Sequence, residues 1–153
     1  MKKSNRLSRD DYIGANAYSI TLCCCDGQKL IDTDEVAGII RGSLAVCAEA
    51  VGFNVIAYCL MPEHAHLLVI ATKPTSDLVS FVRLFKQLSE FGYRLRRNGR
   101  LWQRSFYDHV LRKEESLASV TDYILQNPVR RGLVQDESNY AYSWVSDKDY
   151  CDC

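Results

Sequence analysis

Apolar and polar positions along this chain predict four short strands. Side chains two apart on a strand share a face, so alternation marks a strand with one buried face. Alternating runs cover Ala17–Cys24 and Ser105–Leu111, and apolar runs rich in β-branched residues predict two more strands at Val55–Met61 and His64–Ala71. Only Pro62 and Glu63 separate the middle two runs, which predicts a hairpin with a tight connection.

Apolar residues spaced three and four apart predict three helices between and after these strands. The first runs from Thr33 or Asp34 to Val51, where Gly52 ends it, and the second starts near Ser76–Asp77 and frays by Asn98–Gly99. The third runs from Glu114 to Gln126. We expect Asn127–Pro128 to stop it, because proline disfavours helical geometry in the preceding residue.

The element order β-α-β-β-α-β-α predicts an α+β fold of the ferredoxin-like type, with an antiparallel sheet and an added C-terminal helix. We expect the helices to cover one face of the sheet and to leave the other face free for a ligand. One domain is predicted over residues 16–145, after a polar, basic and mobile arm of residues 1–15 and before an acidic tail of residues 146–153.

Composition places the chain among ordinary globular proteins, with 153 residues of which 47% are hydrophobic and 25% charged. It has neither a membrane-spanning run nor an apolar signal core, so we expect a cytoplasmic location without membrane association. The seven cysteines are an odd number, and Cys23, Cys24 and Cys25 are consecutive. This pattern indicates reduced thiols rather than a disulfide framework, and the alternation leaves open which of the three faces the core.

Charge is balanced overall but unevenly distributed. Residues 83–104 hold seven basic residues and one acid, whereas residues 114–153 hold eight acids and three basic residues. Because attraction to phosphates is local at physiological salt, the basic segment predicts a polyanionic partner. Its basic residues are Arg83, Lys86, Arg94, Arg96, Arg97, Arg100 and Arg104.

Two pairs of residues are candidates for chemistry. His64 and His66 open a strand two apart, so their imidazoles lie on one face about 6.6 Å apart along the strand and can converge on one ion. Tyr123 and Asn127 lie four apart on the third helix, which brings a nucleophile and an oxygen ligand to one face. Each pair also has an ordinary interpretation, as polar residues on a wet strand face and as a core-edge tyrosine before a helix stop.

The motifs taken together resemble a known family. Met-Pro-Glu-His-Ala-His-Leu-Leu at 61–68, Leu-Trp-Gln-Arg-Ser-Phe-Tyr-Asp-His-Val-Leu-Arg at 101–112, Asp-Tyr-Ile-Leu-Gln-Asn-Pro-Val-Arg-Arg-Gly-Leu-Val at 122–134 and Tyr-Ser-Trp at 142–144 occur in the order and spacing of the HUH single-tyrosine transposases. This is the superfamily of Insertion Sequence 200, and the REP-associated tyrosine transposase branch is the most similar. Two departures are Glu63, where relatives commonly have Asn, and residues 24–28 after the first strand.

The resemblance implies a ferredoxin-like transposase that cleaves and rejoins single-stranded DNA at hairpin, REP-like sequences through a 5′-phosphotyrosine. It implies a divalent metal, Mg²⁺ or Mn²⁺, held by His64 and His66, with Tyr123 as the nucleophile. Asn127 matches the polar position that completes the metal site.

The basic segment and its aromatic neighbours are the candidate DNA contacts. Its arginines and Lys86 can follow phosphates, while Tyr93, Trp102, Phe106 and Tyr107 can stack on unpaired bases. Tyr107 is also a second candidate nucleophile, or His109 on the same strand face is a candidate auxiliary proton carrier. Alternatives to a transposase are a catalytically silent nucleic-acid-binding regulator and a metal-dependent hydrolase of a small phosphoester. A monomer and a homodimer both remain open.

Overall fold

The segments predicted as strands form one antiparallel sheet in the computed structural model, which describes residues 8–111 and 115–148. Predictions for the rest of the chain, including Cys151, Cys153 and most of the acidic tail, lie outside the described residues. The strands are β1 (Ala17–Cys23), β2 (Phe53–Met61), β3 (His64–Ala71), β4 (Tyr107–Val110) and β5 (Ser143–Val145). The helices are α1 (Asp34–Val51), α2 (Leu78–Arg94), α3 (Leu117–Leu125) and α4 (Asn127–Arg130). Short 3₁₀ helices span Arg9–Tyr12, Cys25–Gly27 and Glu137–Asn139.

The strand order is β4-β1-β3-β2-β5, and every neighbouring pair is antiparallel. The first four strands therefore have the ferredoxin-like arrangement expected from the sequence, and this prediction is confirmed. β5 adds an edge strand beside β2 that was not predicted. Its three residues are too few for alternation to be recognised.

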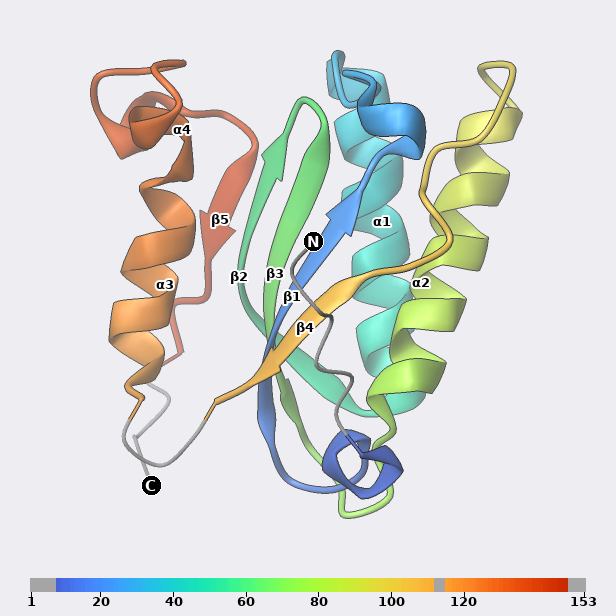
Figure 1. The fold of residues 1–153 in the computed structure, drawn as a ribbon, viewed down its shortest axis with the longest axis vertical. Helices are drawn as coiled ribbons and strands as arrows, with labels where there is room; N and C mark the ends of the chain where they lie inside the picture. Colours follow the sequence, from blue (N-terminus) through green and yellow to red (C-terminus); the bar gives the residue numbers. More distant parts are fainter. Residues whose placement is uncertain (1–7, 112–114, 149–153) are drawn as a thin grey trace.

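Helices lie on both sides of the sheet (Figure 1). α1 and α2 pack together over the main core, to which Ile20, Leu67 and Phe81 belong. α3 packs on the opposite face through Ile124, which shares a smaller apolar cluster with Leu68. The expectation that one face is free of helices is therefore wrong, because the added helix buries its own apolar side against that face.

The helix ends follow the sequence signals closely. The Thr33 side chain accepts a hydrogen bond from the backbone nitrogen of Val36, and Gly52 ends α1 with a positive φ of 83°. Asp77 caps α2 in the same way as Thr33 caps α1.

The prediction for Asn127–Pro128 needs a correction. α3 ends at Leu125, but α4 begins at Asn127, with Pro128 in its first turn. Proline is tolerated there because its missing N–H would have no partner within the helix. Pro128 thus separates two short helices rather than ending helical structure.

Part of the predicted N-terminal arm contacts the domain. The Tyr18 hydroxyl donates to the backbone oxygen of Asp11 at 2.9 Å, and Tyr12 packs against the main core. Among the three consecutive cysteines, Cys24 is buried and its neighbours are partly exposed. All described cysteines are free thiols, as expected. Within residues 8–111 and 115–148, no helix is long and apolar enough to cross a membrane.

Candidate active site

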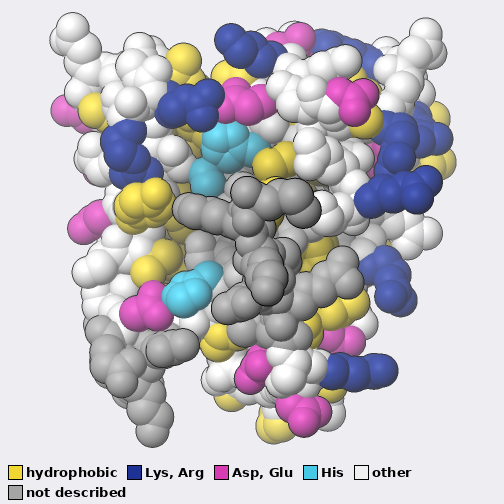
Figure 2. All heavy atoms as spheres, in the orientation of Figure 1, with side chains coloured by type: hydrophobic (Ala, Val, Ile, Leu, Met, Phe, Trp, Pro, Cys, Tyr) yellow, Lys and Arg dark blue, Asp and Glu magenta, His cyan; other side chains and the backbone are white. Residues whose placement is uncertain are grey.

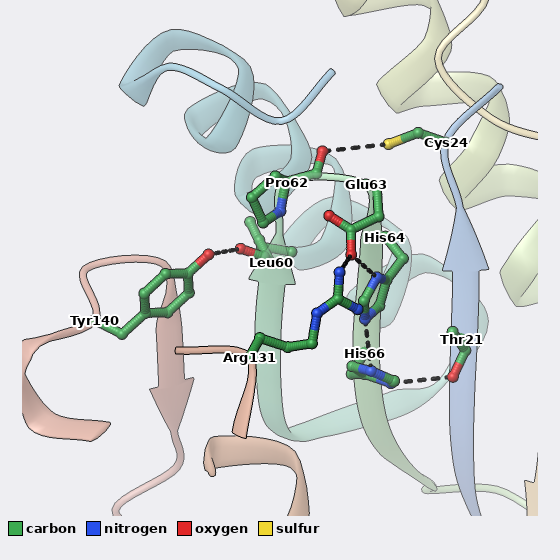
Figure 3. Close-up of polar contacts among 9 residues, drawn as sticks. All are labelled: Thr21, Cys24, Leu60, Pro62, Glu63, His64, His66, Arg131 and Tyr140. Carbon is green, nitrogen blue, oxygen red and sulfur yellow. Dashed lines mark hydrogen bonds and ion pairs between the residues drawn. The ribbon is translucent and has the colours of Figure 1, made fainter. Parts of the chain in front are cut away.

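The two imidazoles of the His-x-His motif point at each other at the start of β3 (Figure 3). Their Nε2 atoms are 2.9 Å apart. His66 Nδ1 lies 3.0 Å from the Thr21 hydroxyl oxygen, and His64 Nδ1 lies 3.2 Å from Glu63 Oε1. Each ring is therefore held by a contact to its Nδ1 atom, and its Nε2 atom points toward the other ring.

Strand register decides what surrounds the imidazoles. Directly opposed residues in antiparallel strands point to the same face of the sheet. The neighbours of the two histidines on that face are Cys23 and Met61 beside His64, and Thr21 and Cys59 beside His66. This is the face on which α3 packs, since Leu68 follows His66 two residues later and belongs to the cluster with Ile124. The helix that carries Tyr123 and the histidine pair thus share one layer.

Burial keeps both imidazoles neutral at pH 7. It lowers the pKa of His66 to about 4, with further lowering by the neighbouring His64 and by the positive charge of Arg130. Burial also lowers the pKa of His64, although the Glu63 carboxylate opposes this. Neutral imidazoles are the form in which histidine binds a metal.

The histidine pair fits a divalent metal. Two neighbouring ligands about 2.1 Å from an octahedral ion are themselves about 3 Å apart, and the Nε2 atoms are 2.9 Å apart. The Glu63 carboxylate accepts but does not donate, which favours the proton of His64 on Nδ1 and a lone pair on Nε2. The Thr21 hydroxyl is able to accept from His66 Nδ1 in the same way. Among the described residues, no three His, Cys, Asp or Glu side chains form a metal-binding group.

The burial of His66 predicts a specific loss of stability in acid. Because the unfolded chain binds a proton near pH 6.5 and folded His66 only near pH 4, stability is lost as the pH falls between these values. We expect this residue to contribute a loss of about 2 kcal/mol between pH 7 and pH 4.5 in metal-free protein. Urea unfolding of the wild type and of His66→Gln at both pH values measures it.

The glutamine variant separates this effect from acid titration elsewhere. It cannot gain the proton, so its stability should fall less between the two pH values than that of the wild type. An equal fall in both proteins would show that the His66 pKa is not depressed on folding.

Tyr123 lies on the solvent side of α3, with 63% of its surface exposed. The Arg130 guanidinium lies over its ring, with 4.0 Å from Cζ to the ring centroid. Arg130 Nη2 also donates to the Tyr123 backbone oxygen at 2.7 Å. The tyrosine is therefore accessible to a large substrate while its ring stacks against a cation.

Asn127, the other predicted residue of this segment, begins α4 and is 8% exposed. Its residue type suits Mg²⁺ or Mn²⁺, since a side-chain amide oxygen is a hard ligand. Pro128 beside it is also buried, which fixes the start of α4 against the domain.

An ion pair connects α4 to the histidine hairpin. Arg131 Nη2 lies 2.6 Å from Glu63 Oε1, the same oxygen that lies beside His64 Nδ1 (Figure 3). Glu63 Oε1 is buried and makes no well-aligned hydrogen bond, so charge pairing is what compensates its burial.

Sequence reasoning missed Thr21, Arg130 and Arg131. Arg130 and Arg131 follow Tyr123 by seven and eight residues, which places them on one side of a continuing helix. That spacing is the signal that identifies them. They were overlooked because they belong to the acidic part of the chain, and nothing local to Thr21 indicates that it pairs with His66.

The secondary candidates, Tyr107 and His109, share one face of β4, and strand register shows that this is also the face of the histidine pair. Tyr107 and His109 on β4 pair with Thr21 and Ser19 on β1, so Tyr107 is two strands, about 10 Å, from His66. His109 Nε2 lies 2.8 Å from Glu115, and Tyr107 is 59% exposed.

The basic segment lies mainly on the other side of the sheet, on α2 and the loop after it. In Figure 2 its dark-blue side chains gather at the right-hand margin, while the histidines lie nearer the middle. Four of its predicted DNA contacts have protein partners. Lys86 Nζ donates to the backbone oxygens of residues 103–105, and ion pairs join Arg94 to Glu90, Arg96 to Glu35 and Arg97 to Asp32.

The remaining arginines of the segment, Arg83, Arg100 and Arg104, are exposed. Arg100 and Arg104 line a hollow of about 360 Å³ together with Arg94 and Lys86. Four basic side chains of the segment therefore gather around one hollow, which Glu90 also lines.

The prediction that Trp102 stacks on DNA is wrong for this structure. Trp102 is 2% exposed, and its indole nitrogen donates to the Ser89 hydroxyl at 2.9 Å. Tyr93 is also buried, at 3% exposure. Both rings belong to the main core, and Tyr107 is the exposed aromatic among the four that were considered for stacking.

Three comparisons bear on this site. A model of a protein family described as IS200-like transposases matches residues 14–127, a range that includes both histidines, Tyr123 and Asn127. A Haemophilus influenzae protein assigned to the REP-associated tyrosine transposases is 29% identical over 147 residues, which cover 88% of this chain and 82% of that protein. The REP-associated tyrosine transposase of Escherichia coli is 29% identical over 91 residues, which cover 60% of this chain and 53% of that protein.

A solved structure has the same fold. A REP-associated tyrosine transposase bound to a REP hairpin superposes with a TM-score of 0.76, covering 99% of this chain and 96% of that one at 22% sequence identity. The added helix and the fifth strand are therefore within the part of the fold that the two proteins share.

Proposed function

The chain belongs to the IS200-like transposase family, and from this premise we propose that it cleaves and rejoins single-stranded DNA with Tyr123 as the nucleophile. The observation that carries the proposal is the histidine pair, with 2.9 Å between its Nε2 atoms, on the sheet face that the tyrosine helix covers. The substrate we propose is hairpin DNA with single-stranded flanks. The solved relative that shares the fold is bound to a REP hairpin.

The reaction we propose is a transesterification. The Tyr123 oxygen attacks the phosphorus of a phosphodiester, a bond forms between them, and the bond from phosphorus to the 3′ oxygen breaks. The phenol loses its proton and the departing 3′ oxygen gains one, so a 5′-phosphotyrosine and a free 3′ hydroxyl remain. Because the phosphoester is transferred to the protein rather than to water, another 3′ hydroxyl can reverse the step and join new ends.

The chain provides the parts of such a site. His64, His66 and Asn127 would hold a divalent cation, which when bound neutralises charge on the phosphate and orients it. Glu63 and Thr21 contact the Nδ1 atoms of the two imidazoles, so the Nε2 atoms are the ones that would bind the cation. The exposure of Tyr123 lets its hydroxyl reach a phosphate on a hairpin flank.

The exposed arginines at the end of α2 suit the flanking phosphates. Arg100 and Arg104 lie in the hollow beside that helix, and Arg83 is exposed on α2 itself. We propose that these three are the main phosphate contacts of the basic segment. We do not expect Lys86 to contribute much to DNA binding, since its ammonium group already donates hydrogen bonds to three backbone oxygens.

Covalent capture of DNA tests the proposal. Purified protein is incubated with a labelled REP hairpin that has single-stranded flanks on both sides, in the presence of Mn²⁺ or Mg²⁺. We expect a protein–DNA band that survives denaturation, and no such band when EDTA is present. Tight hairpin binding without any covalent band would instead support the silent nucleic-acid-binding regulator.

A further inference from the structure

Arg130 is a neighbour of both halves of the candidate active site. Its guanidinium lies over the Tyr123 ring at 4.0 Å, and α4, on which it lies, contacts β2. Its positive charge acts on His66 and also on Cys59, the residue opposite His66 on β2. A cation therefore lies against the Tyr123 ring, on a helix that contacts the strand beside the histidine pair.

The charge of Arg130 has no acidic partner among residues 8–111 and 115–148. Its neighbour Arg131 differs, because it pairs with Glu63 at 2.6 Å. A guanidinium has five N–H donors, and Arg130 uses one nitrogen on the Tyr123 backbone oxygen. The guanidinium therefore has N–H donors in addition to the one that this backbone oxygen takes.

From this geometry we propose that Arg130 binds a non-bridging oxygen of the scissile phosphate and stabilises the charge that develops as Tyr123 attacks. The inference rests on the proposed function and adds a residue to it. Planar N–H donors match phosphate oxygens, and a guanidinium stays protonated throughout the reaction. Arg130 therefore neither gives nor takes a proton, and the bonds made and broken are those of the transesterification.

The contact between Arg130 and the Tyr123 ring also places a bound phosphate relative to the tyrosine. A phosphate bound by Arg130 lies close to the Tyr123 ring, because the guanidinium is 4.0 Å from the ring centroid, and this brings phosphorus near the attacking oxygen before reaction. Arg131 cannot take this role without leaving the buried Glu63 oxygen uncompensated. Arg130 thus contacts the substrate, whereas Arg131 pairs with Glu63 between β2 and β3.

Arg130→Gln tests the proposal in single-turnover adduct formation with the labelled REP hairpin and Mg²⁺. We expect the rate to fall between about a hundredfold and a thousandfold, which is the range for loss of one donor to a developing anion. DNA affinity should change less than about threefold, since many other phosphates are contacted. Arg130→Lys should recover part of the rate, because it keeps the charge but loses the planar donors.

A matched control removes a charge elsewhere. Arg41→Gln changes an exposed arginine on α1, on the other side of the sheet, and should leave the adduct rate unchanged. If Arg41→Gln and Arg130→Gln slow the reaction equally, the effect is one of general charge and the proposal is wrong.

Sulfur substitution of the two non-bridging oxygens distinguishes phosphate contact from mere positioning of Tyr123. For one diastereomer we expect a slower reaction in the wild type that Mn²⁺ does not restore, and no additional slowing in Arg130→Gln. Equal slowing by sulfur in both proteins, for both diastereomers, would overturn the proposal. A wild type that forms no adduct would instead refute the proposed function, so the two failures are distinguishable.

Discussion

Tyr123→Phe should abolish the covalent band with hairpin DNA while leaving DNA binding intact. The substitution removes the one oxygen that forms the phosphoester and keeps the ring that stacks with Arg130. Because Tyr123 is 63% exposed, loss of its hydroxyl should change the free energy of unfolding by less than about 0.5 kcal/mol. Denaturing gels measure the adduct, and a gel shift under native conditions measures binding.

Tyr107→Phe is the matched variant for this experiment. Tyr107 has a similar exposure, 59%, and lies on the same sheet face, but it is on β4 and two strands from His66. We expect it to form the adduct at close to the wild-type rate. Loss of the adduct in Tyr107→Phe, together with its retention in Tyr123→Phe, would show that Tyr107 on β4 is the nucleophile instead.

His66→Gln should lower the rate of adduct formation at least about 10³-fold, since Lewis-acid stabilisation contributes several kcal/mol and each 1.36 kcal/mol is a factor of ten. The glutamine removes Nε2 from the pair that is 2.9 Å apart and leaves His64 as a single nitrogen ligand. Mn²⁺ binding, followed by calorimetry, should weaken in parallel. DNA affinity without metal should stay close to that of the wild type.

His109→Gln controls for the loss of a histidine. His109 is exposed and pairs with Glu115, away from the Nε2 pair. Its substitution should leave Mn²⁺ affinity unchanged. Equal weakening of Mn²⁺ binding in His109→Gln and His66→Gln would show that the ion binds outside the His-x-His motif.

The motifs and apolar patterns of the sequence were enough to predict the family and most of the fold. The resemblance to the IS200-like transposases and their REP-associated branch is confirmed by the family model and by the relatives. Strands β1 to β4 and the first two helices lie where the apolar patterns and end signals placed them, since Thr33, Gly52 and Asp77 act through neighbours only a few residues away. These features depend on local backbone preferences, which a sequence displays directly.

Contacts between distant segments could not be predicted from local patterns. That Trp102 belongs to the core and not to a DNA surface depends on Ser89 of α2 lying within reach of its indole nitrogen. That α3 covers the histidine face depends on Ile124 meeting Leu68, more than fifty residues away. Neither the loop around Trp102 nor the apolar side of α3 reveals which surface it will meet.

The sequence by itself determined the chemistry available to this protein, namely two imidazoles on one strand face, a tyrosine and an asparagine on one helical segment, and a surplus of arginines. Only the tertiary structure decided that Glu63 and Thr21 hold the imidazoles, that Arg131 is paired and that Arg130 lies against Tyr123. The physical reason is that periodicity reports which way a side chain points within its own element. Its partners are set by strand register and by how the elements pack, and both depend on the whole chain.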